Sequence, residues 1–332
     1  MTSQATRGDT SAELVRLLAG DDADVAKQAD LLRAASALTE RGRRERPVLE
    51  VANTLWAWRD LPLNEDFLGE LAAWPNGGVK TAPFVTDPGE ACRMINADVA
   101  ETTHDLIPEL LPPGSVQEDT VASLVNALYL KVAWVHPFDE NRTEDADFHA
   151  PGGTRRVPTM RVSEELGYAA RAGWQLVELP GAGGVSAAIL LPDGDLAAQE
   201  STVDEDLLLS LLSAKKNRQV RLSMPKVRLD QRAALKSALQ GLGVRTMFTG
   251  AADFAPLSPD PRLVVDDVVH QAVLRLDEQG LEGAAATAVM IRVLSMVTPV
   301  DPVEVIVDRP FLLLVRHAET GVVYFFARVV EP

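Results

Sequence analysis

The sequence predicts a single domain of the α+β class, and two observations favour this class. In the first part of the chain, apolar residues recur at intervals of three and four positions, which is the spacing of amphipathic helices. From about Phe148 onward, short apolar segments separated by turn residues dominate, which is typical of strands. Helices and strands therefore gather in separate parts of the chain, whereas they would alternate in a parallel α/β sheet.

Helical spacing occurs in four segments: residues 11–45, Leu63–Trp74, Pro88–Pro113 and Gln231–Gly243. Gly20 and Gly42 divide the first segment into two or three helices, because glycine commonly follows a helix end. Asn64 is the expected N-cap of the second segment. Pro88 suits the first turn of the third, which should end where the two prolines at its end break it.

Strand patterns occur in five segments: Pro47–Trp58 and residues 155–162, 168–180, 185–194 and 218–229. Thr120–Trp134 is continuously apolar, so it is a buried helix or a strand covered on both faces, and the β-forming residues at its end favour a strand. In Arg309–Pro332, two apolar runs flank the polar turn His317–Gly321, which predicts a hairpin.

Composition limits the class of partner. The formal net charge of −16 argues against nucleic acids and anionic membranes, because the field of the protein repels phosphate. Cys92 is the only cysteine, so no intrachain disulfide is possible. The N-terminus has no apolar core of a secretory signal, and no run approaches the roughly 20 apolar residues of a membrane span. We expect a soluble protein that is cytoplasmic, or extracellular if the true N-terminus is longer.

The sequence has no motif of a catalytic or cofactor site. It contains no G-x-S-x-G, Walker loop, C-x-x-C or H-E-x-x-H. "GAGGVS" (Gly181–Ser186) joins two strands, so we interpret it as a hairpin turn. The histidines lack the close spacing of metal ligands: His104, His136, His149, His270 and His317. We therefore expect no enzyme, no cofactor and no metal.

Three separated segments resemble one protein family in their order and spacing. They are "NALYLKVAWVHPFDENRTEDADFH" (Asn126–His149), "VVHQAVLRLDEQGLEGAAATAVMI" (Val268–Ile291) and the C-terminal "RPFLLLVRHAETGVVYFFARVVEP" (Arg309–Pro332). All three are similar to the serpins, a family of large serine-protease inhibitors. The resemblance covers about residues 11–332. It implies mixed β-sheets, a helical cluster and an exposed reactive-centre loop over about residues 279–300.

The resemblance also explains the unusual composition of residues 276–297, in which acidic residues are followed by very small ones. Such a segment can be an exposed loop and still enter a sheet as a strand without burying a charge. About ten new hydrogen-bonded positions at roughly 1 kcal/mol each would release on the order of 10 kcal/mol. The alternative is a surface helix, because alanine is the best helix former. The implied hinge residues are Glu278, Gly280, Leu281, Glu282, Gly283, Ala284, Ala285 and Ala286.

In serpins, the bond offered to the protease lies a fixed distance beyond the hinge glutamate. Counting Glu278 as the first residue, the seventeenth is Leu294, so the resemblance implies Leu294–Ser295 as the reactive bond. An apolar residue at this place favours a chymotrypsin-like or subtilisin-like serine protease as the partner. Arg292 is the alternative bait, which would suit a trypsin-like protease.

The resemblance assigns supporting roles to other residues. Lys226 and Glu278 match an ion pair at the top of the main sheet, although an ordinary surface pair is the alternative. Asn126 and His270 match polar residues beneath the centre of that sheet, where its strands must part, and for His270 a core histidine is the alternative. Trp134 is expected to pack in the core near the opening end of the sheet.

The chain departs from the serpin pattern at several places. Leu281 replaces a small hydroxyl residue of inhibitory members, Gly283 replaces an alanine, and Asp98 replaces a common tryptophan. The N-terminal helices of the family are missing, either because the true chain is longer or because the sheet lacks its underlying helix. The resemblance implies a monomeric inhibitor that acts as a suicide substrate. The alternative is a non-inhibitory serpin-like binding or storage protein, in which these departures abolish rapid insertion.

Overall fold

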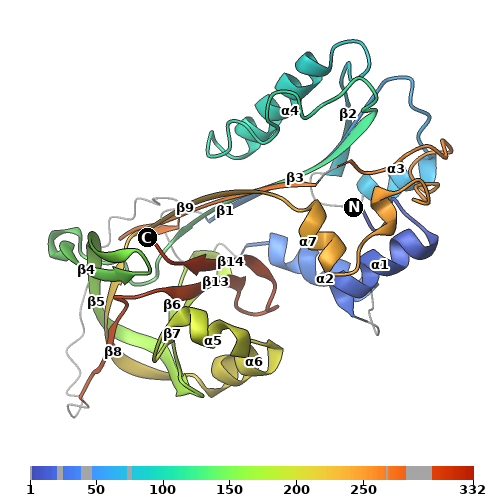
Figure 1. Ribbon diagram of the computed structural model, residues 1–332. Coiled ribbons are helices and arrows are strands. Elements are labelled where there is room, and N and C mark those ends of the chain that lie inside the picture. Colours follow the sequence, from blue (N-terminus) through green and yellow to red (C-terminus); the bar gives the residue numbers. More distant parts are fainter. Residues whose placement is uncertain (1, 21–24, 39–46, 73–76, 267, 282–300) are drawn as a thin grey trace. The chain divides into compact units, whose positions relative to one another are not determined.

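The structure, a computed structural model, describes residues 2–20, 25–38, 47–72, 77–266, 268–281 and 301–332 (Figure 1). The chain divides into two compact units, each built from segments far apart in the sequence. The first unit comprises residues 1–36, 49–129 and 230–273, and the second comprises residues 37–48, 130–229 and 274–332. The single domain expected from the sequence stays a prediction. Among the described residues, no helix combines the length and apolar character needed to cross a lipid bilayer.

The strands form two mixed sheets, as the α+β class requires. The six-stranded sheet has the order β2 (Gly77–Thr81), β1 (Val48–Ala57), β3 (Ala122–Ala133), β11 (Gly280–Leu281), β10 (Val269–Leu276) and β9 (Val227–Ala234). The eight-stranded sheet has the order β12 (Val303–Ile306), β8 (Lys216–Pro225), β5 (Gly153–Arg171), β6 (Trp174–Pro180), β7 (Val185–Pro192), β13 (Phe311–His317) and β14 (Val323–Val329), with β4 (Glu144–Ala150) paired to β5. Strand β2 is parallel to β1 and β12 is parallel to β8, whereas β5, β6, β7, β13 and β14 pair antiparallel in that order.

The first unit contains the predicted helical cluster: α1 (Gly8–Ala19), α2 (Val25–Ser36), α3 (Glu65–Ala72), α4 (Pro88–Thr102), α7 (Lys236–Gly241) and the short 3₁₀ helix η4 (Thr246–Phe248). Helices α1 and α2 confirm two helices in residues 11–45, and Gly20 follows α1 as expected. Asn64 lies directly before α3 as predicted, and its side-chain amide donates to the carbonyl oxygens of Ala255 and Pro256.

Helix α4 covers part of the six-stranded sheet within the first unit. It begins as predicted, with Pro88 in its first turn, and the Asp87 carboxylate accepts a hydrogen bond from the backbone N–H of Glu90. Its apolar side chains share one core with residues of β1 and β3. These buried residues are Ala91, Cys92, Ile95 and Val99 of α4, Trp56 of β1, and Val125 and Ala127 of β3. The sequence of residues 120–134 is compatible with a buried helix or a strand, and the structure shows that most of this segment is strand β3.

Two predicted helices are shorter than their sequence patterns suggested. Helix α4 ends at Thr102, well before Pro112, because His104 and Asp105 adopt left-handed backbone angles, with φ of 49° and 62°. The segment predicted to be helical from Gln231 instead continues strand β9 to Ala234, and only Lys236–Gly241 is helical. Sheet pairing overrides the helix propensity of this alanine-containing stretch.

The second unit is built around strands β6, β7 and β13. Strand β7 lies between β6 and β13, and all eight of its residues are buried, so both faces of the sheet are covered there. Helices α5 (Leu196–Gln199) and α6 (Glu205–Ala214) lie beside these strands (Figure 1), and leucines of both helices share a buried core with them. The C-terminal hairpin is confirmed as β13 and β14, and "GAGGVS" is confirmed as a turn between β6 and β7, where Gly183 and Gly184 have positive φ.

A buried ionic cluster joins three strands of this unit. Glu178 of β6 accepts hydrogen bonds from Arg316 of β13, at 2.8 Å, and from Ser186 of β7, at 3.0 Å. Lys215, which follows α6, pairs with the same carboxylate. The side chains of Glu178 and Arg316 are only 12% and 10% exposed. Burial by itself raises the pKa of Glu178, but the hydrogen bonds from the cations outweigh it and hold the pKa below its ordinary 4.5.

Candidate functional site

The candidate site is the hinge segment, residues 277–281, in the second unit. Its last two residues form strand β11, which lies between β3 and β10 and is antiparallel to both. Leu281 pairs with Val132 on one side and with Leu276 on the other, and it is 1% exposed. Gly280 and Leu281, which fall within the loop predicted for about residues 279–300, belong to the sheet, and residues 282–300 of that prediction lie outside the described residues.

Gly280 fits this position because it lacks a Cβ atom. A Cβ on Gly280 would lie 2.0 Å from the carbonyl oxygen of Val132 and 2.9 Å from the Cα of Ala133. Both are backbone atoms of β3, which cannot rotate away as a side chain could. Only glycine allows β11 to approach β3 this closely.

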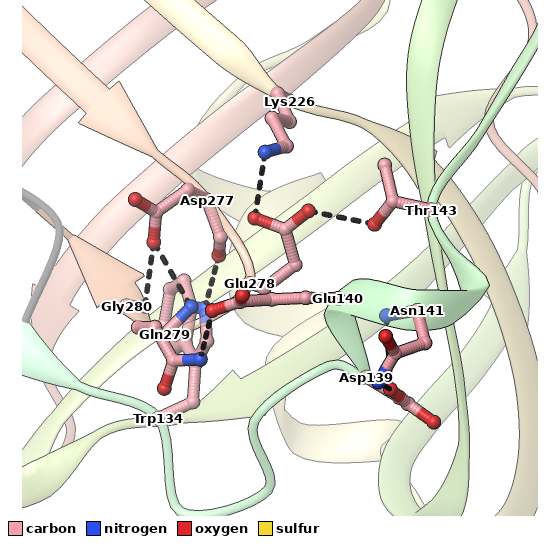
Figure 2. A network of polar contacts seen from close by, with 10 residues as sticks. All are labelled: Trp134, Asp139, Glu140, Asn141, Thr143, Lys226, Asp277, Glu278, Gln279 and Gly280. Atoms are coloured by element: carbon pink, nitrogen blue, oxygen red, sulfur yellow. Dashed lines mark hydrogen bonds and ion pairs between the residues drawn. The ribbon is translucent and has the colours of Figure 1, made fainter. Parts of the chain in front are cut away.

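Glu278 is held by three contacts beside β11, and Figure 2 draws the two that its carboxylate makes. One carboxylate oxygen, Oε2, lies 2.8 Å from Nζ of Lys226, and the other, Oε1, accepts a hydrogen bond of 2.6 Å from the hydroxyl of Thr143. Its backbone carbonyl accepts a hydrogen bond from the N–H of Phe138 at 2.9 Å. The Glu278 side chain is 5% exposed, so the predicted pair with Lys226 is present and is not an ordinary surface pair.

The charge of Glu278 depends on these partners. Burial by itself raises its pKa, but hydrogen bonds from Lys226 and Thr143 outweigh burial, so the pKa lies below its ordinary value of 4.5. The carboxylate is therefore ionised at neutral pH. Substitution of Lys226 would leave the buried carboxylate of Glu278 without its cation. Removing one partner of a buried ion pair destabilises a protein more than replacing both partners with apolar residues.

The neighbouring residues fix the turn between β10 and β11. Trp134 donates its indole N–H to the carbonyl of Asp277 at 2.9 Å and its backbone N–H to the carbonyl of Gln279 at 2.9 Å. The carboxylate of Asp277 accepts from the backbone N–H groups of Gln279 and Gly280. The side-chain amide of Gln279 donates to Glu140, in the 3₁₀ helix η1 (Glu140–Arg142), at 2.7 Å (Figure 2).

Trp134 is buried as predicted, at 1% exposure, and its indole also anchors the hinge. Sequence reasoning did not assign Asp277, Thr143 or Glu140 to the site. A signal was available for Asp277, because an aspartate at the start of a turn commonly accepts from backbone N–H groups two and three residues later, here those of Gln279 and Gly280. Thr143 and Glu140 lie in the segment Asn126–His149, which carries the family resemblance, but no local signal pairs them with the hinge.

The structure places the remaining predicted residues in two groups. Asn126 and His270 lie in the first unit, on β3 and β10, and both are exposed. The default expectation of a core histidine is therefore wrong for His270, and the role of the two residues in strand parting stays a prediction. The others lie outside the described residues: Glu282, Gly283, Ala284, Ala285, Ala286, Arg292, Leu294 and Ser295.

Comparison with known proteins gives a consistent result. A family model described as serpin (serine protease inhibitor) matches residues 1–332. An alpha-1-antitrypsin-like protein of Tamias sibiricus is 32% identical over all of this chain and 80% of its own length. A serpin-like protein of Thermococcus kodakarensis is 30% identical over 100% and 78% of the two chains. The leukocyte elastase inhibitor of Bos taurus is 29% identical over 100% and 89%.

Solved structures share the fold. Native protease nexin-1 with heparin superposes with a TM-score of 0.84, at 25% identity, over 100% of this chain and 89% of its own. Serpin48 of Tenebrio molitor gives a TM-score of 0.81 at 26% identity, covering 100% and 88%. Thyroxine-binding globulin in complex with thyroxine gives 0.84 at 23% identity, covering 100% and 89%, which shows likeness of fold alone.

Proposed function

Because the chain belongs to the serpin family, we propose that it inhibits serine proteases by offering Leu294–Ser295 for cleavage and then inserting the severed loop into its six-stranded sheet. The loop would enter between β3 and β10, in continuation of β11. The protein would thus act once, as a suicide substrate.

The observation that supports this proposal most strongly is the position of β11. Gly280 and Leu281 pair with β3, and Leu281 also pairs with β10, so the backbone at the start of the loop already lies between these strands. A loop that continues from Leu281 could extend both ladders without changing their direction. Each added position contributes a net hydrogen bond of roughly 1 kcal/mol, so insertion of the whole segment would be strongly favourable.

The chemistry of the proposed step belongs to the protease. Its serine hydroxyl attacks the carbonyl carbon of Leu294, its histidine takes the hydroxyl proton, and the same histidine returns it to the leaving amine of Ser295. The ester that remains joins Leu294 to the protease. Insertion of the loop would carry the protease along and distort its active site before water can hydrolyse the ester. This chain supplies the bait and the free energy of insertion.

A second candidate is a binding or storage protein without inhibitory activity. The size of Leu281 favours this candidate, because leucine is larger than the small hydroxyl residue of inhibitory serpins, and overpacking between two strands would slow insertion. The thyroxine complex of thyroxine-binding globulin illustrates that the fold also binds small molecules.

A gel assay distinguishes the two candidates. Incubation with chymotrypsin or subtilisin should give a covalent complex that survives denaturing electrophoresis, because the acyl ester is trapped. Leu294→Arg should transfer complex formation to trypsin, since the side chain before the cleaved bond fills the specificity pocket. The matched control is Leu242→Arg, which changes a leucine that is 66% exposed and should leave the preference unchanged.

Three outcomes would contradict the proposal. Cleavage of the unsubstituted protein by each protease without any complex would establish the non-inhibitory alternative. A covalent complex with trypsin that is cleaved after Arg292 would show that the reactive bond follows Arg292 and not Leu294. An unchanged preference in Leu294→Arg would show that Leu294 is not the bait.

A further inference from the structure

A hollow of about 400 Å³ lies in the first unit between α4, β1 and β2, and it does not involve the hinge. This volume falls within the range of small-molecule sites, which run from roughly 300 to 1,000 Å³. The residues that line it are Glu50, Val51 and Thr54 of β1, Gly78, Val79 and Lys80 of β2, and Asp98 and Thr102 of α4. All of these residues belong to the first unit.

The charges around the hollow favour a cation. Two carboxylates, Glu50 and Asp98, face a single ammonium group, that of Lys80. His104 lies beside the hollow, with Nε2 3.1 Å from a carboxylate oxygen of Glu50. The C-terminal end of α4 carries the negative partial charge of the helix dipole, and no basic residue in its last turn offsets this charge.

The acidic groups have capacity for another donor. One oxygen of Asp98, Oδ1, pairs with Lys80, whereas Oδ2 is buried and has no hydrogen-bond partner among the described residues. An unsatisfied buried carboxylate oxygen is costly, and the terminal torsion of aspartate is soft, so a small rotation could turn Oδ2 toward a donor in the hollow. Glu50 is only half-buried, and its carboxylate can accept a second donor besides His104.

From this geometry we infer that the hollow binds a small aliphatic ammonium compound, such as a linear diamine. The ammonium groups would bind Glu50 and Asp98, and the methylene chain would lie over Gly78, on the face of β2 that also carries Lys80. The hydroxyl of Thr54 or Thr102 would accept a further N–H. This inference does not depend on protease inhibition.

Gly78 offers a way to close the hollow without disturbing the fold. A Cβ at this position would meet no atom within 4 Å, and Gly78 lies in strand β2, where valine is favoured. Gly78→Val should therefore fold normally and occupy the space that the ligand needs.

The test is isothermal titration of the full chain with 1,4-diaminobutane at constant ionic strength. We expect saturable binding of one diamine per chain, and no binding of 1,4-butanediol or butanedioate, which have the same length but no positive charge. Glu50→Gln should weaken binding about tenfold or more, the size of one charge-assisted hydrogen bond. Gly78→Val should weaken it similarly while melting at the temperature of the unsubstituted protein.

Glu118→Gln is the charge-matched control. Glu118 is exposed outside the hollow, and its substitution changes the net charge by the same amount as Glu50→Gln. Binding should be unchanged in this variant. The inference would be overturned by absence of saturable binding, by unchanged binding in both Glu50→Gln and Gly78→Val, or by equal losses in Glu50→Gln and Glu118→Gln. The last result would mean a general attraction of diamines to a chain with a net charge of −16.

Discussion

Glu178→Ala is expected to lower the free energy of unfolding by roughly 3–5 kcal/mol, because it leaves a buried cation without its partner. A terminal N–H of the Arg316 guanidinium, on a side chain only 10% exposed, donates to Glu178, and the Nε of Arg316 is buried without a hydrogen-bond partner among the described residues. Lys215 is 29% exposed and can turn toward water more easily. Denaturant unfolding of both proteins at neutral pH measures the difference.

The same carboxylate makes this difference depend on pH. Because the pKa of Glu178 is lowered in the folded state, its stabilising contribution is complete above pH 4.5, the ordinary value, and is lost as the pH falls through the lowered pKa. The two unfolding curves should therefore converge in acid. The double variant Glu178→Leu with Arg316→Met should recover most of the loss, since it removes both buried charges. A double variant as unstable as Glu178→Ala would show that packing, and not the unpaired cation, causes the loss.

Gly280→Ala is expected to expel β11 from the sheet. The new Cβ would lie 2.0 Å from the carbonyl oxygen of Val132, a clash that only separation from β3 relieves. Leu281 would then lose its burial, at a cost of about 3 kcal/mol when its hydrogen bonds are included. Hydrogen exchange of the backbone amides of residues 277–281 should become much faster. If insertion passes through this position, the yield of covalent complex with chymotrypsin should also fall.

Gly152→Ala is the matched control, because a Cβ at Gly152 meets no atom within 4 Å. It should preserve both the slow exchange and the yield of complex. Slow exchange at Leu281 in the Gly280→Ala variant would contradict the close approach of β11 and β3.

The hinge could be located from the sequence because its signals are local or belong to a family pattern. The ion pair of Glu278 with Lys226 and the C-terminal hairpin were both predicted, and both are present. The other contacts of Glu278 could not be found this way. Thr143 reaches Glu278 across 135 residues of sequence, and an isolated threonine carries no signal for such a contact.

Element ends were also less predictable than the elements themselves. The pattern of α4 continues to Pro112, but the left-handed residues His104 and Asp105 end the helix first. Neither residue is a glycine, so no local signal marks this helix end. The entry of Leu281 into the sheet depends on the space that Val132 and Leu276 leave between two strands, which local sequence does not encode.

The most direct measurement compares the melting temperature of the intact protein with that of protein cleaved once, at Leu294–Ser295. If the loop inserts in continuation of β11, the cleaved form gains on the order of 10 kcal/mol. Its melting temperature should then rise by roughly 15 °C, because an unfolding entropy of about 2.1 cal/mol/K per residue gives roughly 1.4 °C per kcal/mol for 332 residues. Equal melting temperatures for the two forms would mean that the cut loop stays outside the sheet, which contradicts the proposed mechanism.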